Sequence, residues 1–132
     1  MGIAVPAEVE SGEPRVGATP DTVRKLLALG ATVRVASGAG LASGITDEDY
    51  AAAGATIAPS NAEALVGAAI VLKVRRPRAD ELGAYPHGAL VLAIMDPYGQ
   101  HEALAALAQA NVSAFAMELM PRITRAQVMD VL

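Results

Sequence analysis

The residues whose types and spacing best suit ligand binding lie near the end of the chain, in the stretch FAMELMPRITRAQVMD that runs from Phe115 to Asp130. Pro121 has no backbone N–H and ends an apolar run, so a polar loop is expected between a strand and a helix. In open α/β sheets, ligands usually bind beyond the carboxyl ends of the strands, although an ordinary surface loop has a similar composition. Its polar side chains include Arg122, Arg125, Gln127 and Asp130.

Two other cationic side chains stand out, and one of them, Lys73, is a candidate for the same ligand-side crevice. Arg15 lies in a long irregular crossing that follows a short apolar strand. Lys73 stands near the end of an apolar strand, and its side chain either points into the crevice or extends into solvent. The second alternative would place Lys73 beside a basic cluster, which is interpreted as a solvated loop broken by Pro77. The cluster consists of Arg75, Arg76 and Arg78.

Other ligand-binding patterns in the sequence are weak. The turn SGAGLASG, from Ser37 to Gly44, can present bare backbone N–H groups to a phosphate, but its spacing fits neither G-x-G-x-x-G nor a P-loop. A merely flexible loop remains the alternative. His87 and His101 lie in polar turns without a carboxylate or second histidine at ligand spacing, so no metal site is predicted.

The elements that must position these residues alternate between strand and helix. Helix starts are indicated by Thr19-Pro20-Asp21, by Thr46 and by Asn61 as an N-cap. This order predicts an α/β three-layer sandwich with a mainly parallel sheet, flavodoxin-like or Rossmann-like. The expected strands are Ile3–Val5, Thr32–Ala36, Ala55–Ala58, Ala69–Val74, Ala89–Met95 and Val112–Ala116; the expected helices cover residues 20–29, 46–53, 61–66, 82–87 and 100–109.

Composition limits the function classes. The 132 residues suffice for one domain, whose core must come from aliphatic residues because only 3% of the chain is aromatic. A net charge of −4 disfavours a nucleic-acid partner on electrostatic grounds, and the absence of cysteine excludes disulfides and thiolate chemistry. The charge-free apolar stretch from Gly88 to Met95 is far too short to span a membrane.

Both ends of the sequence resemble a known family. AFAMELMPRITRAQVMDVL, residues 114–132, resembles the signature of the NAD(H)-binding alpha subunit of proton-translocating NAD(P) transhydrogenase. IAVPAEVESGEPRVGATPDTVRKLLALG, which starts at Ile3, is similar to the start of that subunit and of alanine dehydrogenase. The FAMELMPR–RAQ–MD pattern is closer to the transhydrogenase.

The resemblance implies hydride transfer between NADH and NADP⁺ coupled to proton translocation. Arg122, Gln127 and Asp130 match a polar loop beside the nicotinamide ring, in which Arg122 and Gln127 hydrogen-bond the cofactor and Asp130 orients the arginine. The glutamine is expected close to where the two nicotinamides meet. Direct hydride transfer is the cofactor's own reaction, so the protein supplies position rather than an acid, base or nucleophile.

Two alternatives remain open. In alanine dehydrogenases, the residues that match Arg15 and Lys73 bind the amino or keto acid, which favours the substrate domain of such an enzyme. The strand from Leu90 to Met95 contains no histidine, however, whereas alanine dehydrogenases place a catalytic one there. The other alternative is a non-catalytic, flavodoxin-like interaction module.

The resemblance also defines what is expected around this chain. Residues 1–132 match the N-terminal portion of the family domain, cut at the start of the interdomain helix, and the Rossmann half that holds most of NAD(H) is missing. NADP(H) is expected on a partner domain, and the partners are the NADP(H)-binding and membrane domains of the complex. The full-length domain is expected to form a homodimer on the cytoplasmic side, peripheral to the inner membrane, and to bind no nucleic acid.

Overall fold

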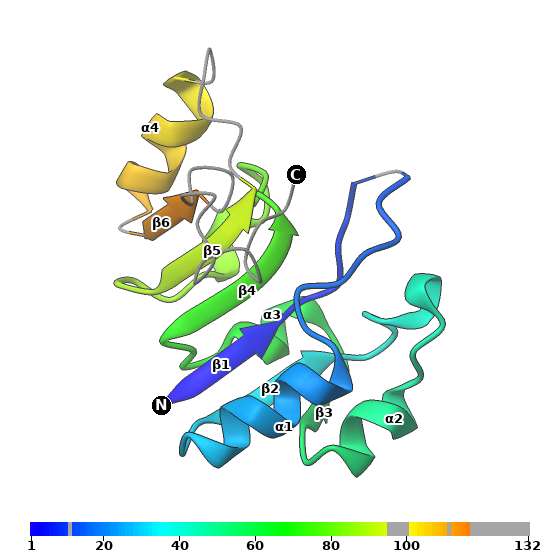
Figure 1. Ribbon diagram of the computed structural model, residues 1–132. Helices are drawn as coiled ribbons and strands as arrows, with labels where there is room; N and C mark the ends of the chain where they lie inside the picture. The colour runs from blue at the N-terminus through cyan, green and yellow to red at the C-terminus, as the bar shows by residue number, and fades with distance from the viewer. Residues whose placement is uncertain (11, 95–100, 111, 117–132) are drawn as a thin grey trace, which may run out of the picture.

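A computed structural model shows a six-stranded, fully parallel sheet in the order β3-β2-β1-β4-β5-β6 (Figure 1). The structure describes residues 1–10, 12–94, 101–110 and 112–116. The strands are β1 (Gly2–Val5), β2 (Thr32–Ala36), β3 (Thr56–Ala58), β4 (Ile70–Arg75), β5 (Leu90–Ile94) and β6 (Ser113–Ala116). The predicted parallel α/β architecture is therefore confirmed, and the direction of winding reverses between β1 and β4.

Helices pack on both faces of this sheet. The α-helices are α1 (Pro20–Ala28), α2 (Asp47–Ala52), α3 (Asn61–Leu65) and α4 (His101–Gln109), and short 3₁₀ turns are η1 (Leu41–Ser43) and η2 (Leu82–Ala84). Val23 of α1 and Tyr50 of α2 pack with Val5 and Val35 on one face. The opposite face is covered by side chains from α3, η2 and α4, namely Leu65, Leu82 and Leu107. These three layers agree with the predicted sandwich.

The helix starts follow from local capping chemistry, with one correction. Thr19 accepts a hydrogen bond from Thr22 N at 3.3 Å, and Thr46 forms a capping box with Asp49. The prediction that Asn61 is the N-cap of α3 was wrong, because Ser60 is extended and its hydroxyl accepts from Glu63 N at 3.2 Å. Asn61 is already helical, which leaves its amide free for a distant partner.

That partner is the backbone of Ala7, just beyond β1. Asn61 Oδ1 accepts from Ala7 N at 2.8 Å, and Asn61 Nδ2 donates to Ala7 O at 3.1 Å. The two bonds satisfy both backbone groups of Ala7 where the sheet can no longer do so. The first residues of the crossing between β1 and α1 are thereby fixed at the carboxyl end of the sheet.

Candidate functional site

The carboxyl ends of β1 and β4, together with the crossing at residues 6–19, form what we call the switch-point edge. Glu8 ties the crossing to the end of β4, since its carboxylate accepts hydrogen bonds from Val74 N at 3.0 Å and Arg75 N at 2.9 Å. The register of β4 against β5 shifts in this region, between Leu72 and Arg75. Glu8 therefore satisfies strand N–H groups at an irregular strand end.

Glu13 is the charged centre of this edge. Its side chain is only 4% exposed, and it accepts from Arg15 Nε at 2.8 Å, from Arg15 Nη2 at 2.9 Å and from Arg75 Nε at 2.9 Å. The fork of hydrogen bonds from Arg15 and the added bond from Arg75 lower the pKa of Glu13 to about 2. The guanidinium of Arg15 is thus oriented while its side chain stays 51% exposed.

Lys73 occupies a buried ion pair at the same edge. Its Nζ lies 3.0 Å from Glu81 Oε2, and the two side chains are 1% and 14% exposed. The other carboxylate oxygen of Glu81 accepts from Arg78 N at 2.8 Å. The alternative in which Lys73 extends into solvent is therefore wrong. The prediction that Arg75 lies in a solvated loop is also wrong, because Arg75 is the last residue of β4 and its guanidinium pairs with Glu13.

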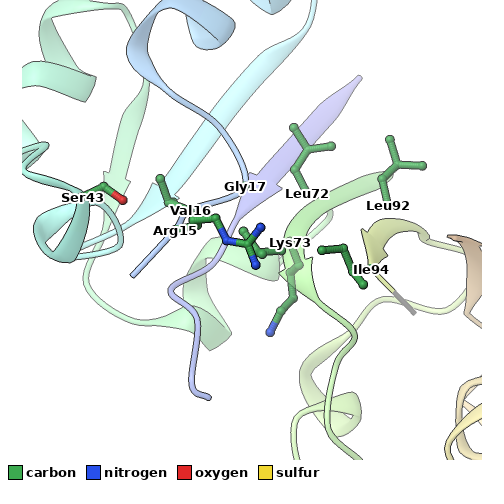
Figure 2. Close-up of a pocket in the computed structure, with 9 residues that line it drawn as sticks. Arg15, Val16, Gly17, Ser43, Leu72, Lys73, Leu92 and Ile94 are labelled. Carbon is green, nitrogen blue, oxygen red and sulfur yellow. The ribbon is translucent and has the colours of Figure 1, made fainter. Parts of the chain in front are cut away.

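A cavity of about 370 Å³ opens beside these residues (Figure 2). Side chains of β4 and β5 make it mainly apolar, and the guanidinium of Arg15 lies at its side. Figure 2 shows the Lys73 side chain running away from Leu72 and Leu92, as strand alternation requires. The cavity thus combines an apolar surface with one oriented cation. Its lining residues are Arg15, Val16, Gly17, Ser43, Leu72, Lys73, Val74, Leu92 and Ile94.

The buried hydroxyl of Tyr85 adds a polar group on the other face of the sheet. Tyr85 is 4% exposed, and its Oη has no hydrogen-bond partner among the described residues. Burial raises the pKa of Tyr85, and the negative charges of Glu81 and Glu8 add to this effect. Tyr85 therefore stays a neutral hydroxyl within the electrostatic reach of the Lys73–Glu81 pair.

The glycine-rich turn after β2 already holds an anionic group of the protein itself. Asp47 accepts from Ser37 Oγ at 2.6 Å and from Gly38 N at 2.9 Å. These two bonds, with the hydroxyl contributing most, lower the pKa of Asp47. A carboxylate of α2 thus takes the position in which a phosphate cradle would bind its ligand, and the turn has a structural role.

The structure brings together only some of the predicted site residues. Arg15 and Lys73 lie at the same edge, but the alternative in which the Lys73 side chain points into the crevice is also wrong, because the side chain runs away from the cavity (Figure 2). Arg122, Gln127 and Asp130 lie outside the described residues, as does the predicted turn at residues 96–99. The acidic partners Glu8, Glu13 and Glu81 were missed. The pairing of Glu13 with Arg15 could have been predicted, because the two residues are only two positions apart. The role of Glu8 could not, because it bonds a backbone segment more than sixty residues away.

The described residues offer neither a metal cluster nor a helix that could cross a bilayer. Within the portion of the chain that the structure describes, no three His, Cys, Asp or Glu side chains are grouped so that they could hold a metal ion. Across the same residues, no helix has the length and apolar character that crossing a bilayer requires.

Comparison with known proteins gives this geometry a family context. The family described as "Alanine dehydrogenase/PNT, N-terminal domain" matches residues 4–132. The chain is 44% identical over 137 aligned residues to the first portion of the NAD(P) transhydrogenase alpha subunit of Rhodospirillum rubrum, a match that covers 100% of this chain and 36% of the relative. It is 39% identical over 132 residues to the NAD(P) transhydrogenase alpha subunit of Cereibacter sphaeroides, covering 100% of this chain and 25% of that relative.

Two solved structures also resemble this chain, and the transhydrogenase is more similar to it than the alanine dehydrogenase. A transhydrogenase from Sinorhizobium meliloti superposes with a TM-score of 0.95 at 50% identity, covering 100% of this chain and 39% of that one. An L-alanine dehydrogenase superposes with a TM-score of 0.86 at 31% identity, covering 96% of this chain and 34% of that one. The chain therefore spans between a quarter and two fifths of the length of these relatives.

Proposed function

The chain belongs to the family of alanine dehydrogenase/PNT N-terminal domains, and from this we propose that it is the N-terminal portion of the NAD(H) domain of a proton-translocating transhydrogenase. The observation that carries the proposal is the 50% identity to a solved transhydrogenase over the whole chain, against 31% to an alanine dehydrogenase. The complete protein would transfer hydride between NADH and NADP⁺ and couple this transfer to proton translocation.

The proposed role of this chain is to form one wall of the nicotinamide site. Arg122 and Gln127 are proposed to hydrogen-bond the carboxamide and ribose of NAD(H), and Asp130 to hold the guanidinium of Arg122 in position. The Rossmann half outside this chain would bind most of the dinucleotide. NAD(H) supplies the hydride, and the protein's contribution is the alignment of donor and acceptor rings.

The same proposal defines the partners and the location. Hydride transfer to NADP⁺ requires an NADP(H)-binding domain, and coupling to protons requires a membrane domain, so both are proposed partners. The complete NAD(H) domain is proposed to act as a homodimer on the cytoplasmic face, peripheral to the inner membrane. The switch-point edge supports the proposed nicotinamide site rather than these partners, because ligands of open α/β sheets usually bind in the crevice at the carboxyl edge of the strands.

An alanine dehydrogenase-like function is the second candidate, favoured by the position of Arg15 and Lys73 at one edge. Two observations weigh against it. Both cations already have carboxylate partners, Glu13 and Glu81. The strand β5, Leu90–Ile94, reads LVLAI and offers no histidine as a catalytic group. The charge arrangement and the missing histidine thus support the transhydrogenase proposal.

The decisive experiment is a hydride-transfer assay on the complete NAD(H) domain mixed with its NADP(H)-binding partner. We expect transfer from NADH to an NADP analogue, and a loss of about 10-fold or more in Gln127→Ala and Arg122→Ala because the rings lose alignment. Glu48→Gln, an exposed acid on α2, is the control. Normal transfer in both site variants would reject the site assignment.

The same preparation separates the two candidate functions. Pyruvate-dependent NADH oxidation that is abolished by Arg15→Ala and by Lys73→Ala would establish the amino-acid dehydrogenase instead. Its absence, together with transfer between the two nicotinamide cofactors, is the result expected here.

A further inference from the structure

A second cavity, of about 330 Å³, lies at the amino ends of the strands, opposite the arrowheads in Figure 1. It forms because α3 is too short to cover this face of the sheet. The helix has five residues and is about 8 Å long, whereas β2 has five residues and is about 16 Å long. Ala64 of α3 packs on Ala36 and Ala58 near the carboxyl ends of the strands, which leaves the amino half of the face open to the cavity. We call this cavity the amino-edge hollow; its lining residues are Gly2, Ile3, Thr32, Val33, Arg34, Thr56, Ala64, Val66, Gly67 and Ala68.

Polar side chains line this hollow, although a parallel sheet usually carries apolar residues on both faces. Ala36 packs against α3, so strand alternation places Arg34 and Thr32 on the same face. Thr56 is the register partner of Arg34 in β3 and therefore lies beside it on that face. Gly2, the register partner of Thr32, has no side chain, which leaves room in the hollow. Hydrogen-bonding side chains of two strands thus line one cavity.

The guanidinium of Arg34 has one edge in use and one edge without a partner among the described residues. Its Nη1 donates to Glu63 O at 3.0 Å and to Val66 O at 3.1 Å, which satisfies two carbonyl groups at the end of α3. Neither Nε nor Nη2 bonds any described residue, and no described carboxylate pairs with Arg34. Arg15 gives the same Nε–Nη2 edge to both oxygens of Glu13. The unused edge of Arg34 is therefore the one that binds a carboxylate elsewhere in this chain.

The charge and shape of the hollow favour a carboxylate over a phosphate. Arg34 is the one cation among its lining residues, and two carbonyl oxygens already contact that guanidinium. One positive charge balances a carboxylate but not the charge of about −2 that a phosphate ester carries. Ala64, Ala68 and Val66 add an apolar wall, and a volume of about 330 Å³ is at the lower end for small-molecule sites.

We propose that the amino-edge hollow binds small organic carboxylates, with the Nε–Nη2 edge of Arg34 as a bidentate donor and the Thr56 hydroxyl as a further donor. The hydrocarbon part of the ligand lies along the apolar wall. This site goes beyond the proposed function, because it lies at the opposite edge of the sheet from the cavity beside Arg15. Its Kd is expected to be about 1–10 mM, because a single half-buried guanidinium supplies the charge.

Solution NMR of the ¹⁵N-labelled 132-residue chain tests the proposal, because the Nε–H signal of an arginine reports contact with an anion. We expect butyrate, exchanged for chloride at constant ionic strength, to shift the Nε–H signal of Arg34 in a saturable way. Arg24 is the internal control, since its Nη1 pairs with Asp21 in the same manner but its side chain is 56% exposed and lies outside the hollow. The Nε–H signal of Arg24 is expected to show no saturation.

Two variants separate ligand binding from the helix-capping role of Arg34. Thr56→Val removes a hydroxyl and leaves the cap of α3 in place, so it is expected to weaken butyrate binding by about 3-fold or more. Arg34→Lys keeps the charge but lacks the fork of donors, and is expected to weaken binding by about 10-fold or more. Butyrate-induced shifts of backbone amides around the hollow measure its affinity, and circular dichroism checks that the variant is folded. If Arg34→Lys does not fold, Thr56→Val decides alone.

Three results would overturn the proposal. The first is a shift at Arg34 that rises linearly with butyrate or is matched by the shift at Arg24. The second is an unchanged butyrate affinity in the folded variants. The third is tighter binding of inorganic phosphate than of butyrate, which would contradict the choice of a carboxylate as the ligand.

Discussion

At the scale of single residues, the switch-point edge depends on Glu13. One carboxylate holds two guanidinium groups that come from different segments of the chain, Arg15 in the crossing and Arg75 at the end of β4. Because the side chain of Glu13 is almost fully buried, its hydrogen bonds are stronger than those of an exposed ion pair. Glu13 thus fixes the crossing and orients Arg15 at the same time.

We predict that Glu13→Gln destabilises the chain by about 1.5–3 kcal/mol, because a charge-assisted network is replaced by weaker neutral hydrogen bonds. Urea unfolding at pH 7 measures this change. Glu10→Gln, an exposed acid in the same crossing, is the control and is expected to change stability by less than about 0.5 kcal/mol. Equal stability of the two variants would contradict the central role of Glu13.

The pH dependence of this effect follows from the lowered pKa of Glu13. The pKa is 4.5 in an ordinary carboxyl group and about 2 in the folded chain, so folding favours the charged form. Its stabilisation is therefore fully present above about pH 5 and is lost as the pH falls toward 2. The stability difference between the unaltered chain and Glu13→Gln should shrink over that interval, and a constant difference would contradict the assignment.

The residue scale also shows where sequence reasoning fell short. Lys73 was identified as a candidate because a cation near a strand end is visible in the sequence, and Arg15 because it matches a position of a known family. Their carboxylate partners were not, because Glu81 pairs across a turn and Glu8 bonds backbone groups that approach only in the folded sheet. Whether a lysine at a strand end faces a ligand or a carboxylate is decided by tertiary contacts that periodicity does not contain.

At the scale of elements, strands and helices were largely predictable. All six strands were expected within one or two residues at either end, because buried parallel strands read as short apolar runs between turn residues. The cap of α3 was the exception. Ser60 and Asn61 are both good N-cap residues, and the choice between them depends on Ala7, fifty-four residues away, which uses the amide of Asn61.

Gly17 illustrates an element-level constraint that follows from close packing. A Cβ at this position would lie 2.3 Å from Leu72 O and 2.6 Å from Leu72 C, both of them backbone atoms of β4. We predict that Gly17→Ala destabilises the chain by about 2 kcal/mol or more, because neither segment can move without disturbing the sheet. Chemical denaturation measures the effect.

Gly83→Ala is the matched control for that variant. Nothing lies within 4 Å of a Cβ built at Gly83 in η2, so its effect is expected to stay within about 0.5 kcal/mol. Because Gly17 also lines the cavity, Gly17→Ala should push the crossing away from β4 and weaken any ligand contact made by Arg15. A fully stable Gly17→Ala would show that the crossing is not pressed against β4 in solution.

At the scale of the whole molecule, the strand order follows from rules that the sequence alone can invoke. Strands that alternate with helices wind in right-handed crossovers, and the reversal between β1 and β4 creates a crevice at the carboxyl edge. These rules do not predict which side chains line that crevice. In this chain the cavity at this edge is lined mainly by apolar side chains, and the cations Arg15 and Lys73 have the acidic partners Glu13 and Glu81.

This arrangement leads to a prediction about cofactor binding by the 132-residue chain itself. The glycine-rich turn from Ser37 to Gly44 already holds the carboxylate of Asp47, which takes the Gly38 N–H and would repel a pyrophosphate. We therefore expect isothermal titration calorimetry with NADH to give a Kd weaker than about 1 mM, since the proposed wall supplies only hydrogen bonds to one end of the dinucleotide. In Asp47→Asn the amide oxygen can still accept from Gly38 N while the amide NH₂ donates to Ser37 Oγ, so the competing charge is removed with little change in the turn. This variant is not expected to restore tight binding, because the pyrophosphate site is proposed to lie in the Rossmann half. Micromolar binding of NADH by the unaltered chain would show instead that the switch-point edge is a complete nucleotide site.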